Sequence, residues 1–417
     1  MALAETQVVA NELERVEPTV PTLFDRDSVF YANIEKRPVE KVSNRDMRIP
    51  LELRPGGLFG HYDPAGGDMG RGEGPSFDKA LINTVHLKHA VEWHKKAEWA
   101  TDDARKAVVN TFRHLLAKSM SEFRRHVDSL MMTAGNGVLG TISAVSNAGG
   151  FDTYTLNTDG FGARLMRHGQ KVNIYAANLS APVHSTGVET PITYLDLENK
   201  QIKVATVTGA APGQVVLLSG LSGASPTSLL GVPYHMNNAS TGTWLGLDRA
   251  TIPEIRCSRV NANSSPLSLP FPRLAVNKIG DRVGIENGMK FQAWMHPCQQ
   301  QAYEDLGQQV SIINKTAKQE GLDLYFDVQQ LAGIPIRKSY SWDKRRIDLI
   351  VNEAWGRAEM HPAGFYTEGG RKIFELRGLS GGVAAASIFY IVCSFNLFMK
   401  NPTQGVYIDN LAVPSGY

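Results

Sequence analysis

The longest periodic pattern of apolar residues lies between Thr101 and Asn136. Apolar side chains recur there at about every 3.6 residues, which predicts one long amphipathic helix. The positions are Val108, Phe112, Leu115, Leu116, Phe123, Val127, Leu130 and Met131. Asp102 and Asp103 suit the positive end of a helix dipole, and Gly135 and Gly137 favour termination. Such a helix would span roughly 45–50 Å, enough to brace a whole subunit.

A two-stranded excursion is predicted before this helix. Met47–Leu53 and Thr84–Trp93 are strand-like, and a glycine-rich stretch separates them. The glycines predicted for its tip are Gly66, Gly67, Gly70, Gly72 and Gly74. A loop of this length cannot bury a core of its own, so we expect it to lie on a neighbouring molecule. Residues 1–43 mix charges with prolines and lack a sustained apolar face, which predicts an extended arm.

Short alternating runs separated by turn residues fill residues 140–223, which predicts a small β-barrel or sandwich. We expect this unit to be an insertion, because the long helix has no packing partner until the chain returns. Helices are predicted at Pro272–Gly284 and from His296 to Leu306. The later predicted strands are Met289–Met295, Gly333–Ile336, Arg346–Val351, Lys372–Leu376, Ala385–Lys400 and Val406–Leu411. The fold class is therefore α+β.

The stretch Gly382–Met399 approaches membrane-spanning length. Its apolar residues alternate with a mixed face, so we interpret it as a long buried strand rather than a membrane span.

The composition and charge of the chain exclude several classes of function. The formal net charge is +2 over 417 residues, so the chain is not a nucleic-acid binder that works by charge alone. Cys257, Cys298 and Cys393 are far apart and odd in number, which favours reduced thiols over a disulfide framework or a zinc ribbon. The segment Met1–Val20 lacks the basic and apolar regions of a signal peptide.

Three motifs suggest chemistry, but each lacks its required context. Gly378–Gly382 matches G-x-S-x-G around Ser380, yet a long strand follows and no histidine occurs after His361. The glycine-rich stretch Gly67–Gly74 lacks the Gly-Lys-Ser/Thr of a phosphate loop. His86, His89 and His94 cluster with Glu92 but lack metal-ligand spacing. We therefore predict no catalytic residue, no cofactor and no metal.

The long helix also carries a basic stripe. The residues of this stripe that could face DNA are Arg105, Arg113, Lys118, Arg124 and Arg125. Such a stripe is usually the solvated face of a helix. The alternative is a surface that contacts phosphate backbone without reading sequence, in a salt-dependent way.

The order of these parts resembles the major capsid proteins of tailed bacteriophages, which have the HK97 fold. Three phrases carry the resemblance: Phe291–Pro297, Leu331–Ile336 and Ile388–Pro402. The resemblance divides the chain into an N-terminal arm (1–43), an extended loop (44–100), a spine helix (101–136), an inserted β-domain (140–223), a return of the peripheral domain (224–288), an apical domain (289–376) and C-terminal strands of the peripheral domain (377–417).

The resemblance implies a protein that self-assembles through hexamers and pentamers into an icosahedral shell around double-stranded DNA. Such a shell is assembled in the host bacterial cytoplasm and becomes the virion capsid, with no membrane partner. The arm is too short for a built-in scaffolding domain, so separate scaffolding and portal proteins are expected, and decoration proteins are allowed. Two alternatives stay open: a non-viral protein compartment of the same fold, and a serine hydrolase using Ser380.

Overall fold

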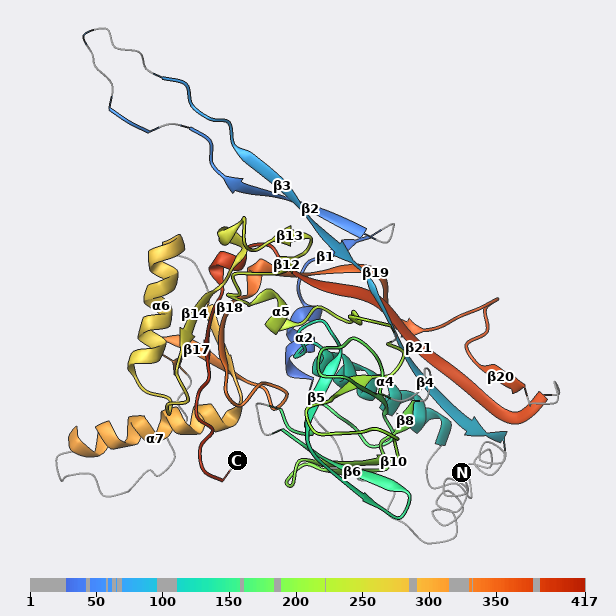
Figure 1. Ribbon diagram of the computed structural model, residues 1–417. Coiled ribbons are helices and arrows are strands. Elements are labelled where there is room, and N and C mark those ends of the chain that lie inside the picture. The colour runs from blue at the N-terminus through green and yellow to red at the C-terminus, as the bar shows by residue number, and fades with distance from the viewer. Residues whose placement is uncertain are drawn as a thin grey trace.

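The structure is a computed structural model that describes residues 28–42, 46–57, 59–61, 65, 70–95, 111–157, 161–183, 189–221, 223–284, 291–314, 330–331, 333–377 and 383–416. Within these ranges, the strands form three larger sheets and two small ones. Helices accompany the sheets, which confirms the α+β class. The largest apolar cluster contains residues from all three larger sheets and from α4 (Thr111–Leu130). The sheets are therefore packed against a shared core (Figure 1).

The five-stranded sheet is built around β21 (Val383–Met399). One path runs β1 (Val39–Lys41), β19 (Trp355–Phe365), β21 and β20 (Phe374–Arg377), and β4 (Val85–His94) also pairs with β21. The alternating residues of β21 from Phe389 to Leu397 are buried, so the prediction of a long buried strand is confirmed. Helix α4 packs against β4 and β21.

The six-stranded sheet has the order β14-β22-β18-β15-β17-β16. Its strands are β14 (Ser258–Asn261), β22 (Val406–Asp409), β18 (Ile347–Val351), β15 (Phe291–Met295), β17 (Ile334–Lys338) and β16 (Gln330–Leu331). Helices α6 (Pro270–Val283) and α7 (Pro297–Asn314) belong to the same part of the molecule (Figure 1). The helices and strands predicted at these positions are confirmed within a few residues at their ends, except that α7 continues to Asn314, eight residues beyond the predicted end at Leu306. Strands β14 and β16 were not predicted.

The pairing between strands departs from the expected grouping. Residues 377–417 were expected to contribute their strands to one domain. Strand β21 lies in the five-stranded sheet, but β22 lies between β14 and β18 in the six-stranded sheet. Residues 289–376 were expected to form the apical domain, but strands β19 and β20, which lie in its later part, pair with β21. The reason is that the chain changes sheets at two short 3-10 turns, η2 (Asn352–Ala354) and η3 (Pro402–Gln404).

The seven-stranded sheet has the order β8-β7-β11-β5-β6-β10-β9. Its strands are β5 (Val138–Ala148), β6 (Phe151–Leu156), β7 (Lys171–Tyr175), β8 (Thr190–Pro191), β9 (Tyr194–Asp196), β10 (Gln201–Ala205) and β11 (Val215–Leu218). Among the described residues, these strands pair only with one another. The β-rich stretch is thus a sheet of its own, and its status as an inserted domain stays a prediction.

The spine helix is shorter at its C-terminal end than the sequence predicted. Helix α4 ends at Leu130, because Thr133 donates its hydroxyl to the Leu130 carbonyl and the backbone then turns. The Met131 carbonyl instead accepts the N–H of Val232, at the start of α5 (Val232–His235). Residues 101–110 lie outside the described residues.

Helix α2 (Val29–Glu35) and strand β19 are among the elements that the sequence analysis missed. Helix α2 lies in the stretch expected to be an unpacked arm, and its Phe30, Tyr31 and Ile34 are buried. The arm expectation is therefore wrong for residues 29–41, because a helix of seven residues is too short to show a period. Strand β19 contains Pro362 and two register shifts, which conceal its alternation.

Candidate assembly surfaces

A β-hairpin leaves the body of the molecule and points away from it (Figure 1). It consists of β2 (Asp46–Arg54) and β3 (Ser76–Asn83), which pair antiparallel from Asp46 opposite Asn83 to Arg54 opposite Ser76. We call residues 46–83 the projecting hairpin. The returning strand was expected at Thr84–Trp93, but that stretch is β4, which pairs with β21 inside the body. The excursion predicted for 44–100 therefore ends at Asn83.

The base of the projecting hairpin is packed on the body. Ala80 and Ile82 are almost fully buried in a small apolar cluster that also contains Trp244 and Leu247. These two residues belong to the paired strands β12 (Thr243–Trp244) and β13 (Leu247–Asp248). The Leu81 N–H donates to the Leu245 carbonyl at 2.8 Å. The base is therefore held by apolar packing, by this backbone hydrogen bond and by the Asn396 side-chain amide, which donates to the Asn83 carbonyl at 2.7 Å.

The outer part of the projecting hairpin carries apolar side chains that this chain does not cover. Phe77 is 64% exposed and Phe59 is fully exposed. Arg54 and Glu254 form an ion pair at 3.7 Å near the outer end of β2, but both side chains are solvated, so this contact adds little stability. Exposed aromatic rings on an element without a second layer of packing make the outer hairpin a candidate surface for binding a partner.

Glycine lets the two strands of the hairpin approach closely near their outer end. A Cβ on Gly56 would lie 2.5 Å from backbone atoms of Glu73, Gly74 and Pro75, so no other residue fits there without moving a strand. The Gly57 N–H donates to the Glu73 carbonyl at 2.7 Å. A Cβ on Gly74, in contrast, would meet nothing within 4 Å. Of the predicted tip glycines, Gly70, Gly72 and Gly74 are described and exposed, and Gly66 and Gly67 lie outside the described residues.

The basic residues of the spine helix do not form one exposed face. Arg125 is 7% exposed and donates to the Glu122 carboxylate at 2.6 Å, and burial lowers the pKa of its guanidinium. It cannot present its charge outward, so it is removed from the predicted DNA-facing set. Arg124 remains about half exposed and pairs with Glu35 at 3.4 Å, and Lys118 is partly buried.

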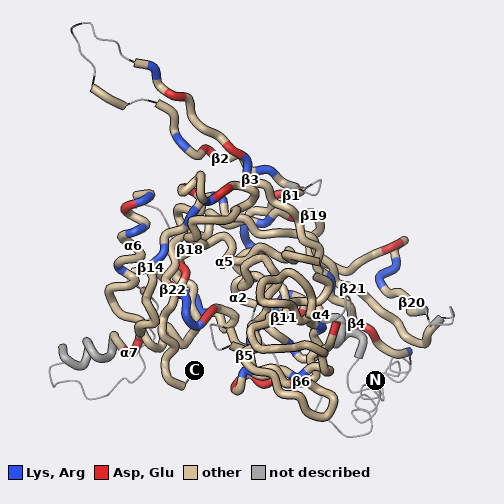
Figure 2. The backbone as a smooth tube through the Cα atoms, viewed as in Figure 1, with Lys and Arg blue, Asp and Glu red and all other residues tan. Residues whose placement is uncertain are grey.

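The other members of that set cannot be placed. Arg105 and the side chain of Arg113 lie outside the described residues. Figure 2 shows Lys and Arg mixed with Asp and Glu along the chain rather than gathered in one region.

The described residues of the three candidate motifs are not brought together into a reactive site. Ser380 lies outside the described residues. On β4, His86 lies 2.6 Å from the Ser394 hydroxyl, and the His89 ring stacks obliquely on His126 at 5.8 Å. Burial lowers the pKa of His89. Within the described ranges, no group of three or more His, Cys, Asp or Glu side chains could hold a metal ion.

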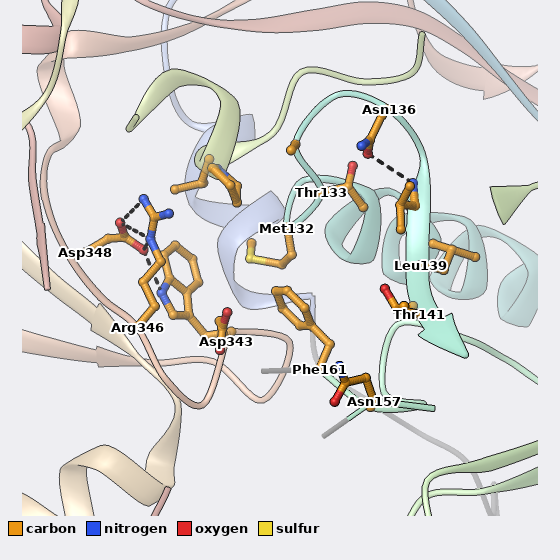
Figure 3. Close-up of a pocket in the computed structure, with 17 residues that line it drawn as sticks. Met132, Thr133, Asn136, Leu139, Thr141, Asn157, Phe161, Asp343, Arg346 and Asp348 are labelled. Carbon is orange, nitrogen blue, oxygen red and sulfur yellow. Dashed lines mark hydrogen bonds and ion pairs between the residues drawn. The ribbon is translucent and has the colours of Figure 1, made fainter. Parts of the chain in front are cut away.

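A cavity of about 350 Å³ lies where the end of α4, strand β5 and the loop before β18 meet (Figure 3). On one side, Arg346 binds the Asp348 carboxylate at 2.7 Å, and the Trp342 indole N–H donates to the same carboxylate at 3.0 Å. Arg346 also donates to the Met236 carbonyl at 2.8 Å. Because this buried pair is satisfied by its neighbours, it ties parts of the chain together and does not supply a free acid or base. No local pattern in the sequence indicates this junction.

The sequence and the fold of the chain were compared with those of known proteins. No protein-family model and no curated protein matches the sequence. The chain is similar to a chain of the cyanophage A-1(L) capsid asymmetric unit, with 10% identity, a TM-score of 0.60 and coverage of 95% of this chain and 96% of that one. It is similar to a chain of the mature capsid of bacteriophage PhiM1, with 10% identity, a TM-score of 0.50 and coverage of 96% and 91%. The holo-SrpI encapsulin complex from Synechococcus elongatus PCC 7942 aligns with 9% identity, a TM-score of 0.47 and coverage of 98% and 97%. The two capsid likenesses show that the chain has the HK97 fold, as expected.

Proposed function

We propose that this chain is the major capsid protein of a tailed bacteriophage and self-assembles into a closed icosahedral shell. The observation that carries this proposal is the projecting hairpin, which leaves Phe59 and Phe77 uncovered on a chain of capsid fold. No reaction is part of the proposed role. Within the described ranges, no helix has both the length and the apolar character needed to cross a membrane.

The proposed mechanism is distributed binding between identical subunits. The projecting hairpin of one subunit lies across its neighbour, so that the exposed rings are buried only after association. Each contact can be modest, because closure of hexamers, pentamers and finally the shell makes every subunit contact several others. The close approach at Gly56 leaves no room for a side chain between the two segments of the hairpin at this point.

Double-stranded DNA is the proposed content of the shell, and its binding is non-specific. Lys118 and Arg124 are the described basic residues of the spine helix that still support this role. Contacts of this kind weaken steeply with salt and do not depend on sequence. Assembly in the host cytoplasm, with separate scaffolding and portal proteins and with decoration proteins allowed, completes the proposal.

The test is assembly of the purified full chain, measured by sedimentation velocity and negative-stain electron microscopy. We expect capsomers or shells from the parent, few or none from Gly56→Ala, and normal particles from Gly74→Ala. The two variants add the same methyl group to the same hairpin, but only the first meets backbone atoms. A parent chain that stays a compact monomer at every concentration would contradict the proposal. So would covalent labelling of Ser380 by a fluorophosphonate, because that would indicate a serine hydrolase.

A further inference from the structure

The chain passes between the six-stranded and five-stranded sheets at two adjacent crossings. One is η2 (Asn352–Ala354), between β18 and β19, and the other contains η3 (Pro402–Gln404), between β21 and β22. The Lys400 N–H donates to the Ala354 carbonyl at 2.7 Å, so the crossings are hydrogen-bonded to each other. Two short segments side by side are the arrangement in which one sheet can rotate against another.

Helix α2 packs on this crossing point. The Phe30 ring is fully buried and lies edge-on to Trp294 of β15 at 5.1 Å and to Trp355, the first residue of β19, at 6.2 Å. The Asn33 side-chain amide donates to the Asn352 side chain in η2 at 3.1 Å. One helix therefore contacts a strand of each sheet and the crossing between them, and Figure 1 shows it in the middle of the molecule.

Two further contacts fix α2 and the residues that follow it. Ser28, at the N-cap position, makes no side-chain hydrogen bond to the helix. The buried carboxylate of Asp128 in α4 accepts the Tyr31 N–H at 2.8 Å instead, from 97 positions away in the chain. After the helix, β1 pairs in parallel with Arg357–Glu359 of β19. The segment Ser28–Lys41, which we call the N-terminal clamp, is thus bonded to α4 and to the five-stranded sheet while it packs on the six-stranded sheet.

We propose that the N-terminal clamp sets the angle between the two sheets, and that its release allows the subunit to adopt a second angle. With the clamp in place, rotation about the crossings would separate Phe30 from Trp294 or from Trp355, and would break the Asn33–Asn352 hydrogen bond. Residues 235–236 also join the two sheets, because His235 Nε2 lies 3.1 Å from the Leu397 carbonyl of β21 and the Met236 carbonyl accepts from Arg346, just before β18. Without the clamp, the crossings and this second connection remain, but the contacts of Phe30 and Asn33 no longer oppose the rotation. The inference rests on the proposed function in one respect: in a shell, this angle contributes to the curvature at which neighbours meet.

The test measures the angle in the unassembled full chain. Nitroxide labels on cysteines that replace Leu274 of α6 and Met360 of β19 report the distance between the two sheets by double electron–electron resonance. Both positions are about half exposed, and the three natural cysteines are buried, so labelling is selective. We expect a narrow distance distribution in the parent and in Lys36→Ala, which changes an exposed residue at the end of the same helix. In Phe30→Ala the width should increase on the order of twofold.

Asn33→Ala provides a milder version of the same change, in case Phe30→Ala fails to fold by circular dichroism. It removes one hydrogen bond to the crossing and should also broaden the distribution. Parent-like widths in Asn33→Ala and in a folded Phe30→Ala would overturn the inference. Because no shell is needed for this measurement, failure of the chain to form particles would refute the proposed function and leave the clamp result standing, and the reverse also holds.

Discussion

His235 should make this protein sensitive to acid, because its hydrogen bonds permit only the neutral imidazole. The side chain is fully buried. Its Nε2 lies 3.1 Å from the Leu397 carbonyl, which can only accept, so Nε2 carries the proton. Its Nδ1 accepts the indole N–H of Trp244 at 3.2 Å. A second proton on Nδ1 would place two donors against each other at a fully buried position.

The structure gives the size and the sign of the effect. Burial lowers the pKa of His235 from 6.5 to about 3, and nearby Arg249 acts in the same direction. A base with a lowered pKa in the folded state contributes stability that is present above pH 6.5 and is lost as the pH falls below that value. Between pH 7 and pH 5, the unfolded chain gains about 0.7 of a proton at this position, which lowers the free energy of unfolding by about 2 kcal/mol.

The assay is reversible urea unfolding of the full chain at pH 7 and pH 5, for the parent and for His235→Gln. Glutamine can donate to Leu397 and accept from Trp244, but it does not titrate. We expect the variant to be about 1–2 kcal/mol less stable at pH 7 and to lose most of this deficit at pH 5. Burial also lowers the pKa of His126 and His296 to about 3, but these groups titrate in both proteins and cancel in the comparison. An equal stability difference at both pH values would refute the argument.

Three further outcomes are expected. Burial raises the pKa of Asp128 from 3.8 to about 6, so its contribution to stability is present below pH 4 and is lost as the pH rises through 6. Asp128→Asn should abolish this change in the free energy of unfolding, which is at most about 3 kcal/mol. The measurement is the urea midpoint of parent and variant at pH 4.5 and pH 7. Phe77→Ser should reduce the yield of shells in sedimentation without lowering the melting temperature. Phe151→Ser, on the seven-stranded sheet, should leave the yield unchanged. Equal yields from the two variants would show that the hairpin is not part of the interface. Gly231→Ala would place a Cβ 2.3 Å from two carbonyl oxygens after α4 and should cost about 2–4 kcal/mol in urea unfolding, against almost none for Gly60→Ala, whose Cβ meets nothing.

The elements with a long internal period could be predicted from the sequence. Strand β21 and helix α6 were located because each keeps one apolar face over many residues, and that pattern is a local property of the chain. The need for a partner was also visible, because the glycine-rich excursion offers no core of its own. Helix α2 could not be found in this way, since seven residues make less than two turns, and β19 was concealed by Pro362 and its bulges.

The candidate surfaces depended on contacts that no local pattern contains. The sequence shows Arg125 as one more charge on a basic stripe, but packing buries it beside Glu122. It indicates Thr84–Trp93 as the returning strand of the excursion, but that stretch pairs with β21 as strand β4, and Ser76–Asn83 completes the hairpin.

The alternation of apolar and polar residues does not determine which strands pair, because it shows only which face of a strand is buried. The sequence by itself determined which segments are apolar on one side and that one of them reaches outward. Only the tertiary structure decided which segments meet, because pairing is fixed by the packing of residues hundreds of positions apart, as when β21 joins β4 across about 300 residues.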